Sequence, residues 1–158
     1  MPNTKTVQVP HLGGIDAAYQ MPNYDSNKPT LVLVNSFTTS SELYQAQFQN
    51  KELTNVMNLI AIELLGHGQT RTKSENFTYW DTAIMNLQVL DALQIKGKIF
   101  VLGTSQGGWI TTRMALLAPE KVRSPSIVVN MPPSDMLRSL ESFHSVHPWT
   151  MNLRGPAN

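Results

Sequence analysis

One short segment, Gly103-Thr104-Ser105-Gln106-Gly107, constrains the fold of this chain more than any other. It follows an apolar run at residues 99–102 and precedes residues 109–117, whose apolar residues recur at helical spacing. A strand that passes so directly into a helix needs a sharp turn, and glycines without Cβ atoms let the two elements approach closely. The pattern therefore predicts that the Ser105 hydroxyl is lifted clear of the end of a buried strand, at the N-terminus of a helix that begins at Gln106.

The apolar runs of the chain predict the strands of a sheet. Three of them are continuous and typical of strands covered on both faces: residues 30–34, 58–62 and 99–102. Two shorter alternating segments, residues 6–9 and 15–20, flank Gly13 and Gly14 and predict an N-terminal antiparallel hairpin.

Helices are predicted between these strands. We expect a short helix over residues 42–48 and a longer one that begins after Thr78, with Asp81 as the acid of a capping box. Its spacing favours a buried stripe that excludes Asp81 and Asn86 and consists of Trp80, Ile84, Leu87 and Leu90. A third helix ends before Pro119. This alternation predicts an α/β fold with a mainly parallel sheet and flanking helices.

The C-terminal part of the sequence differs from the rest. Half of the 10 prolines lie beyond residue 123. We expect residues 1–123 to form the core and residues 124–158 to be an atypical, proline-rich tail of the same domain. Pro125 should confine any strand at residues 127–129 to a sheet edge or shorten it. It also interrupts the expected continuation of residues 121–123, which suggests a frameshift, retained intron or aberrant join near Ser124.

Composition excludes several classes of protein. The net charge is +1 with acids and bases intermixed, so we expect no nucleic-acid partner. The chain has no cysteine and no apolar stretch of membrane-spanning length, so we expect no thiolate metal site, no membrane span and no signal peptide. A cytoplasmic protein without a cofactor or a metal is the resulting expectation, with its oligomeric state left open.

Three segments, in order, resemble the esterase/lipase branch of the α/β-hydrolase fold family. Asn35-Ser36-Phe37 resembles the oxyanion loop usually written His-Gly-Phe, and residues 63–70 resemble the family's Asp-x-x-Gly-His-Gly-x-Ser loop. Residues 103–107 resemble the nucleophile elbow of the family. The resemblance implies a serine hydrolase in which Ser105 attacks a small ester-like substrate, and the backbone N–H groups of Gln106 and Phe37 form the oxyanion hole.

The departures from the family pattern concern the remaining catalytic groups. Asn35 and Ser36 stand where the family has His and Gly, so Phe37 is the less certain of the two donors. Only 53 residues follow Ser105, whereas the family's histidine comes well over a hundred residues after the nucleophile, so the fold is expected to be incomplete. The remaining candidates for a local triad beyond Ser105 are Asp135, Glu141, His144 and His147.

Other conspicuous side chains have simpler interpretations. His67 is expected to form hydrogen bonds within its loop, and His144 and His147 make a poor metal site because no carboxylate lies nearby. Trp80 and Trp109 begin helices, where packing on the sheet accounts for them more simply than a substrate pocket does.

Two further hypotheses stand beside an active hydrolase. One is a truncated, catalytically inactive fragment that at most binds ligands. The other is a relative of small hydrolases of fungal secondary-metabolite and toxin clusters, suggested by residues 63–68 and 103–109. Full-length relatives of that kind are peroxisomal in some cases.

Overall fold

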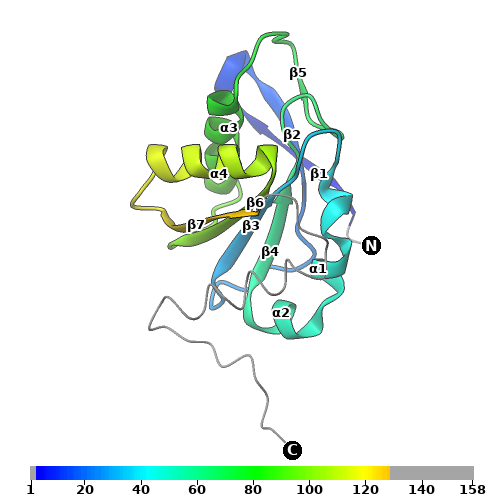
Figure 1. Ribbon diagram of the computed structural model, residues 1–158, viewed down its shortest axis with the longest axis vertical. Coiled ribbons are helices and arrows are strands. Elements are labelled where there is room, and N and C mark those ends of the chain that lie inside the picture. The colour runs from blue at the N-terminus through cyan, green and yellow to red at the C-terminus, as the bar shows by residue number, and fades with distance from the viewer. Residues whose placement is uncertain (1–2, 129–158) are drawn as a thin grey trace, which may run out of the picture.

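A mixed β-sheet forms the centre of the fold in the computed structural model, which describes residues 3–128 (Figure 1). Its strands follow the order β1-β2-β4-β3-β6-β7, and the short β5 pairs with β2. Their bounds are β1 (Lys5–Val9), β2 (Ile15–Gln20), β3 (Thr30–Val34), β4 (Asn58–Ile62), β5 (Arg71–Thr72), β6 (Ile99–Thr104) and β7 (Val122–Val128). Strands β4, β3, β6 and β7 are parallel to one another, whereas β2 is antiparallel to β1, β4 and β5. The predicted α/β class and N-terminal hairpin are confirmed.

The turn of the N-terminal hairpin is wider than a two-residue turn. A 3-10 turn, η1 (His11–Gly13), connects β1 to β2. Leu12, Gly13 and Gly14 all have positive φ, at 51°, 76° and 122°. Successive left-handed residues favour glycine, which explains the Gly13-Gly14 pair.

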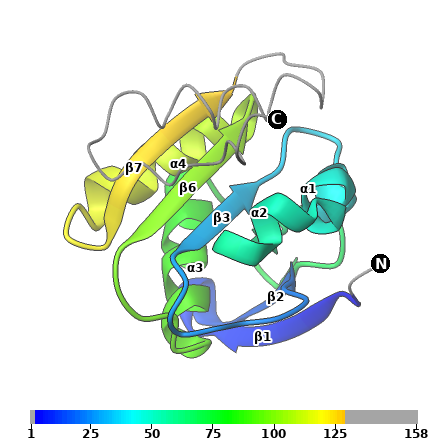
Figure 2. The same cartoon turned by 90° about the horizontal axis from the view of Figure 1, so that it is seen from below.

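Helices cover both faces of the sheet (Figures 1 and 2). On one face lie η2 (Ser41–Tyr44), α1 (Gln45–Gln49) and α2 (Lys51–Val56), and on the other lie α3 (Tyr79–Ala92) and α4 (Gln106–Leu117). Predicted residues 42–48 thus form a 3-10 turn followed by a short α-helix, with Ser40 as the N-cap. Neither α2 nor β5 was predicted, because both are short and have weak patterns.

Alternate residues of the central strands face opposite layers. Val32, Val34, Ile60 and Ile62 pack towards α3 and α4. Their neighbours pack with Tyr44 and Leu53 on the other face: Leu31, Leu33, Leu59 and Ala61. This two-sided burial explains why β3 and β4 read as continuous apolar runs, since successive strand residues point to opposite faces.

The predicted stripe of α3 was correct only in part: Leu90 is fully buried and Leu87 packs against the core, as expected. Trp80 is 43% exposed, whereas Asn86, placed outside the stripe, is fully buried. The residues of α3 that are buried are Thr82, Ala83, Met85, Asn86, Val89 and Leu90. The reason is that α3 packs against α4 as well as the sheet, so its buried face is wider than one apolar stripe and includes polar residues. The amide Nδ2 of Asn86 donates to Met114 Sδ at 3.6 Å across this helix pair.

The expectation that Pro125 interrupts the strand after residues 121–123 was also wrong. Strand β7 runs from Val122 to Val128 and pairs with β6, with Pro125 opposite Val101. Within residues 3–128, β7 is the outermost strand beside β6, as predicted for a proline-containing strand. At such an edge the missing N–H of proline need not break a ladder of hydrogen bonds.

Candidate active site

Ser105 lies at the junction of β6 and α4, where it is the N-cap of the helix. Its φ of 50° and ψ of −115° are rarely adopted by a residue with a side chain. The residues around it hold the turn closed, and the Gly108 N–H donates to the Ser105 carbonyl at 2.9 Å. The predicted strand-turn-helix setting is therefore present, with Ser105 in a strained conformation at the carboxyl end of a buried strand.

The glycines on either side of Ser105 are required by backbone contacts. A Cβ at Gly103 would overlap the backbone of Gly107 at the start of α4. A Cβ at Gly107 would overlap the carbonyl of Val34 at the end of β3 and lie 2.8 Å from the carbonyl oxygen of Asn35. The elbow, residues 103–107, therefore brings the helix as close to β6 and β3 as two backbones allow.

Tyr44 braces the elbow from the opposite face of the sheet. Its hydroxyl donates to the Val34 carbonyl at 2.7 Å and lies 3.1 Å from the Thr104 hydroxyl. The side chain is fully buried, and burial raises the pKa of Tyr44 well above its usual range although the hydrogen bond with Thr104 lowers it. Tyr44 therefore stays protonated and serves as a permanent donor beside the residue that precedes Ser105.

The loop after β3 is held by Asn35. Its Nδ2 donates to the carbonyl oxygens of Ser36 and Thr39, at 3.1 and 2.8 Å, and the side chain is fully buried. Thr38 has a φ of 60°, so the chain bends sharply just after Phe37. The loop thus attains a tight turn without the family's glycine, because the amide of Asn35 satisfies its carbonyl groups.

A second glycine-containing turn, the Glu63 loop (residues 63–70), follows β4. The Glu63 carboxyl group is buried and accepts from the Ser41 hydroxyl at 2.7 Å and from the Gln69 N–H at 2.6 Å. A Cβ on Gly68, whose φ is 52°, would overlap this carboxyl group. Glu63 therefore joins the start of η2 to the far end of its own loop.

His67 lies in the Glu63 loop and its ring forms a hydrogen bond within that loop. Its Nδ1 lies 3.0 Å from the Leu65 carbonyl oxygen, and its ring meets that of Phe37 edge to face with 5.8 Å between centroids. The predicted hydrogen bond within the loop is present.

These segments enclose an open cleft of about 820 Å³. The predicted site residues Ser105, Gln106 and Phe37 all line it, together with His67. Trp109 lines it too and is 62% exposed, so of the predicted positions, in the core or at its rim, the core is excluded. The buried face of α4 consists of Gly107, Gly108, Ile110, Thr111 and Met114, so Trp109 lies outside it, on the rim of the cleft.

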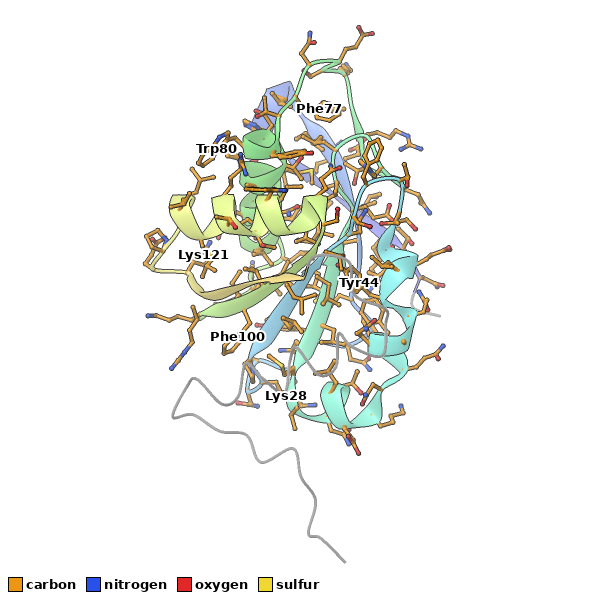
Figure 3. The ribbon with its side chains drawn as sticks, viewed as in Figure 1. Lys28, Tyr44, Phe77, Trp80, Phe100 and Lys121 are labelled. Atoms are coloured by element: carbon orange, nitrogen blue, oxygen red, sulfur yellow. The ribbon has the colours of Figure 1, made fainter. Side chains whose placement is uncertain are left out.

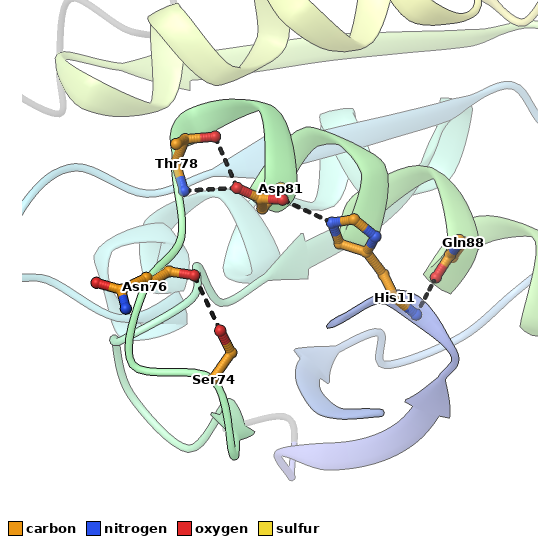
Figure 4. Close-up of polar contacts among 6 residues, drawn as sticks. All are labelled: His11, Ser74, Asn76, Thr78, Asp81 and Gln88. Atoms are coloured by element: carbon orange, nitrogen blue, oxygen red, sulfur yellow. Dashed lines mark hydrogen bonds and ion pairs between the residues drawn. The ribbon is translucent and has the colours of Figure 1, made fainter. Parts of the chain in front are cut away.

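The start of α3 forms another wall of the cleft, where Thr78 and Tyr79 lie. Asp81 Oδ2 accepts from the Thr78 N–H and hydroxyl, both at 2.7 Å, which confirms the predicted capping acid (Figure 4). Asp81 Oδ1 lies 2.8 Å from His11 Nε2, and the His11 N–H donates to Gln88 Oε1 at 3.0 Å. The hydrogen bonds from Thr78, and then the proximity of His11, lower the pKa of Asp81.

Several predicted residues lie outside the part of the chain that the structure describes: Asp135, Glu141, His144 and His147. Within residues 3–128, no group of three or more His, Asp or Glu side chains that could hold a metal ion is found. Sequence reasoning missed the roles of Tyr44 and Glu63. A polar residue directly after the apolar run of β4 was the available signal for Glu63.

Comparison with known proteins identifies the fold. A family model described as alpha/beta hydrolase fold matches residues 29–153. A probable hydrolytic enzyme from Pseudomonas aeruginosa PAO1 is similar with a TM-score of 0.69 and 20% identity, over 81% of this chain and 41% of that one. A putative lipase from Acinetobacter baumannii AYE has a TM-score of 0.66 and 23% identity, over 94% of this chain and 50% of that one. One of the carboxylesterases of the thaumarchaeon Nitrososphaera gargenis has a TM-score of 0.68 and 22% identity, over 94% of this chain and 55% of that one.

At these identities the solved structures show the shared fold alone. This chain spans 41%, 50% and 55% of their respective lengths. No curated protein matches the chain in sequence. Among the described residues, no helix is long and apolar enough to cross a membrane.

Proposed function

The chain belongs to the α/β hydrolase fold family, and from this premise we propose that it is a serine hydrolase acting on an ester-like bond, with Ser105 as its nucleophile. The observation that carries the proposal is the strained Ser105 at the N-terminus of α4, on the wall of an open cleft. A strained serine between a buried strand and a helix is the arrangement in which hydrolases of this fold expose a nucleophile.

The proposed reaction forms a bond between Ser105 Oγ and the carbonyl carbon of the substrate, and the ester C–O bond then breaks to release the alcohol, which takes up the proton removed from Ser105. A water molecule then attacks the acyl group on Ser105, which releases the carboxylic acid and returns the proton to Ser105 Oγ. The backbone N–H groups of Gln106 and Phe37 are proposed to donate to the carbonyl oxygen as it gains negative charge. Gln106 is the first residue of α4, so its N–H has no partner four residues earlier within the helix and adds to the positive end of the helix dipole.

A base must take the proton from the Ser105 hydroxyl, because a serine is a weak nucleophile while it stays protonated. The sequence does not identify this base: His144 and His147, with Asp135 or Glu141 as the acid, are candidates for a local triad, and all four lie outside the described residues. His67 lines the cleft, but its Nδ1 lies within hydrogen-bonding distance of the Leu65 carbonyl, which supports a role in holding the loop.

A place in secondary-metabolite or toxin biosynthesis is a finer prediction, which rests on the resemblance of residues 63–68 and 103–109 to fungal hydrolases. A cytoplasmic location, or a peroxisomal one for full-length relatives, belongs to the same prediction. Comparing the metabolites of the source organism with and without this gene would test it, because without the hydrolase an ester is expected to accumulate and the acid and alcohol formed from it to be lost.

Labelling with a fluorophosphonate tests the nucleophile. The full chain should be labelled, and Ser105→Ala should lose the label together with hydrolysis of 4-nitrophenyl acetate. Ser74→Ala is the matched control, since Ser74 is a half-buried loop residue outside the cleft whose hydroxyl donates to the Asn76 carbonyl at 2.9 Å. A folded protein that is not labelled, or that is labelled equally after Ser105→Ala, would contradict the proposal.

The alternative is a catalytically inactive, ligand-binding protein. One observation favours it: in residues 3–128 the only hydrogen-bonded pair of a histidine and a carboxyl group is His11 with Asp81, and neither lines the cleft. The alternative predicts that Ser105 reacts with the fluorophosphonate no faster than Ser74 does, although ligands still bind.

A further inference from the structure

The cleft beside Ser105 is lined by four aromatic side chains that come from three separate segments. Phe37 follows β3, Phe77 and Tyr79 lie at the start of α3, and Trp109 lies in the first turns of α4. All four are substantially exposed, Phe37 at 65%, Phe77 at 39%, Tyr79 at 41% and Trp109 at 62%. Phe77 and Trp80 are at the same end of the molecule, beside the start of α3 (Figure 3). Large rings gathered around one cavity and left in contact with water are a common sign of a binding site.

The positions of these rings are fixed by their neighbours. The tip of the Phe77 ring lies 3.0 Å from where a Cβ on Gly66 would be, so the absence of a side chain at Gly66 lets the ring approach the loop closely. The Arg113 guanidinium lies 5.6 Å from the Tyr79 ring centroid, and it donates to the Trp109 carbonyl at 2.8 Å. The Phe77 and Tyr79 rings therefore have neighbours that position them before any ligand arrives, which reduces the entropy lost on binding.

Charge is absent from the same lining. Among the described residues that line the cleft, none is Lys, Arg, Asp or Glu, and the polar members are His67, Thr78, Thr82, Ser105 and Gln106. A carboxylate that entered this cleft would lose hydration without meeting a cation of the described lining. An uncharged ring would instead cover exposed aromatic surface, which is worth roughly 25 cal/mol for each Å² of apolar area buried.

We infer that the cleft selects an uncharged ester that carries an aromatic ring, with the ring against the Trp109 and Phe77 side chains and the ester carbonyl at Ser105. The inference rests on the proposed function in that it places the ester carbonyl at the proposed nucleophile. The volume of about 820 Å³ suits a small molecule of this kind. Trp109, four residues after Ser105, is the specificity-determining residue.

Binding to the full chain with Ser105→Ala tests this without relying on catalysis. Three ligands are titrated at pH 8 by nuclear magnetic resonance: methyl 3-phenylpropanoate, the 3-phenylpropanoate anion and methyl butanoate. The neutral aromatic ester is expected to bind about tenfold more tightly than either of the others, since it alone offers a ring without a charge.

Two second substitutions in the Ser105→Ala background locate the site. Trp109→Ala should weaken binding of the aromatic ester about tenfold. Leu116→Ala is the matched control, because Leu116 lies on the same helix, is 67% exposed and does not line the cleft. Both changes remove exposed side chains, so circular dichroism should show a folded protein in each case.

The inference is overturned if the anion or methyl butanoate binds as tightly as the aromatic ester, if Trp109→Ala behaves like Leu116→Ala, or if no ligand shifts any resonance up to its solubility. The proposed function fails on different evidence, namely a folded protein whose Ser105 is not labelled. An inactive protein that still prefers the aromatic ester through Trp109 would keep this inference and remove the catalytic proposal.

Discussion

The elbow and the Glu63 loop border the same cleft and look alike in the sequence, since each has two glycines around a polar residue. They differ in what occupies the space at those glycines. At Gly107 the space is filled by the backbone of β3, whereas at Gly68 it is filled by the Glu63 side chain. Backbone in the centre of a sheet cannot move without disturbing its neighbours, but a side chain can be removed. The elbow is thus fixed by the fold, and the Glu63 loop by one carboxyl group.

The largest effect is expected for Gly107→Ala. Its methyl group would overlap the Val34 carbonyl, and the free energy of unfolding should fall by about 3 kcal/mol or more. Urea denaturation measures this loss. A still larger loss would show as a protein recovered only as aggregates. Gly97→Ala is the control: Gly97 has a φ of 80° but nothing within 4 Å of its Cβ position, so the cost should be only about 1–2 kcal/mol. Equal losses would show that crowding at the elbow is not the cause.

The contrast between backbone and side chain is tested by a double-mutant cycle on the Glu63 loop. Gly68→Ala should cost about 2–3 kcal/mol in the native background, from its φ of 52° and from overlap with Glu63. In a Glu63→Ala background the overlap is gone and the cost should fall to about 1–2 kcal/mol. The free energies of unfolding of all four proteins give the coupling.

The same Glu63→Ala change should leave the cost of Gly107→Ala unaltered, because that overlap is with the backbone of Val34. Coupling between Glu63 and Gly107 as strong as that between Glu63 and Gly68 would remove the distinction between the two turns.

The sequence predicts those parts of this molecule whose constraints are local in the chain, and it does not predict those that depend on distant segments. The elbow was predictable because its constraint is local: a buried strand, a glycine-flanked serine and a helix are contiguous in the chain. Strand β3 was predictable because every residue of it is buried. The buried face of α3 was not, because it depends on α4, whose position is set by the fold.

The site shows the same limit. Ser105, Gln106 and Phe37 were named from the sequence, and all three line one cleft. Tyr44 could not be found in this way, since it is 60 residues from its partner Thr104 and the pair meets only when η2 packs beneath the sheet. Trp109 looked like a packing residue because its exposure depends on which face of α4 packs against the sheet and α3, and the helical pattern alone does not fix that face.

Tyr44→Phe tests whether side-chain hydrogen bonds help to hold the elbow, because it removes the Tyr44 hydroxyl and leaves the backbone contacts in place. The change deletes the hydrogen bonds to Val34 and Thr104, and we expect a loss of about 1–1.5 kcal/mol in the free energy of unfolding. The fluorophosphonate should still label Ser105, since the glycines remain. Complete loss of labelling in a folded Tyr44→Phe protein would mean that the brace, and not the backbone alone, sets the conformation of Ser105.

The smallest effect is expected at the start of α3, where Asp81 caps the helix and contacts His11. Asp81→Asn should lower the free energy of unfolding by about 0.5–1 kcal/mol at pH 7.

The pKa of Asp81 is lowered in the folded chain, chiefly by the Thr78 hydroxyl. A carboxyl group of this kind stabilises the fold above its unfolded pKa of about 4, and the effect is lost as the pH falls through the lower folded pKa. The difference between native and Asp81→Asn proteins should therefore be largest near neutral pH and shrink below about pH 4. Urea denaturation at a series of pH values measures it, and a difference that grows with acidity would show that Asp81 is not stabilised in its charged form. Because the start of α3 is held by the half-buried side chains of Asp81 and His11 and not by packed backbone, a single substitution there should cost less than one in the elbow.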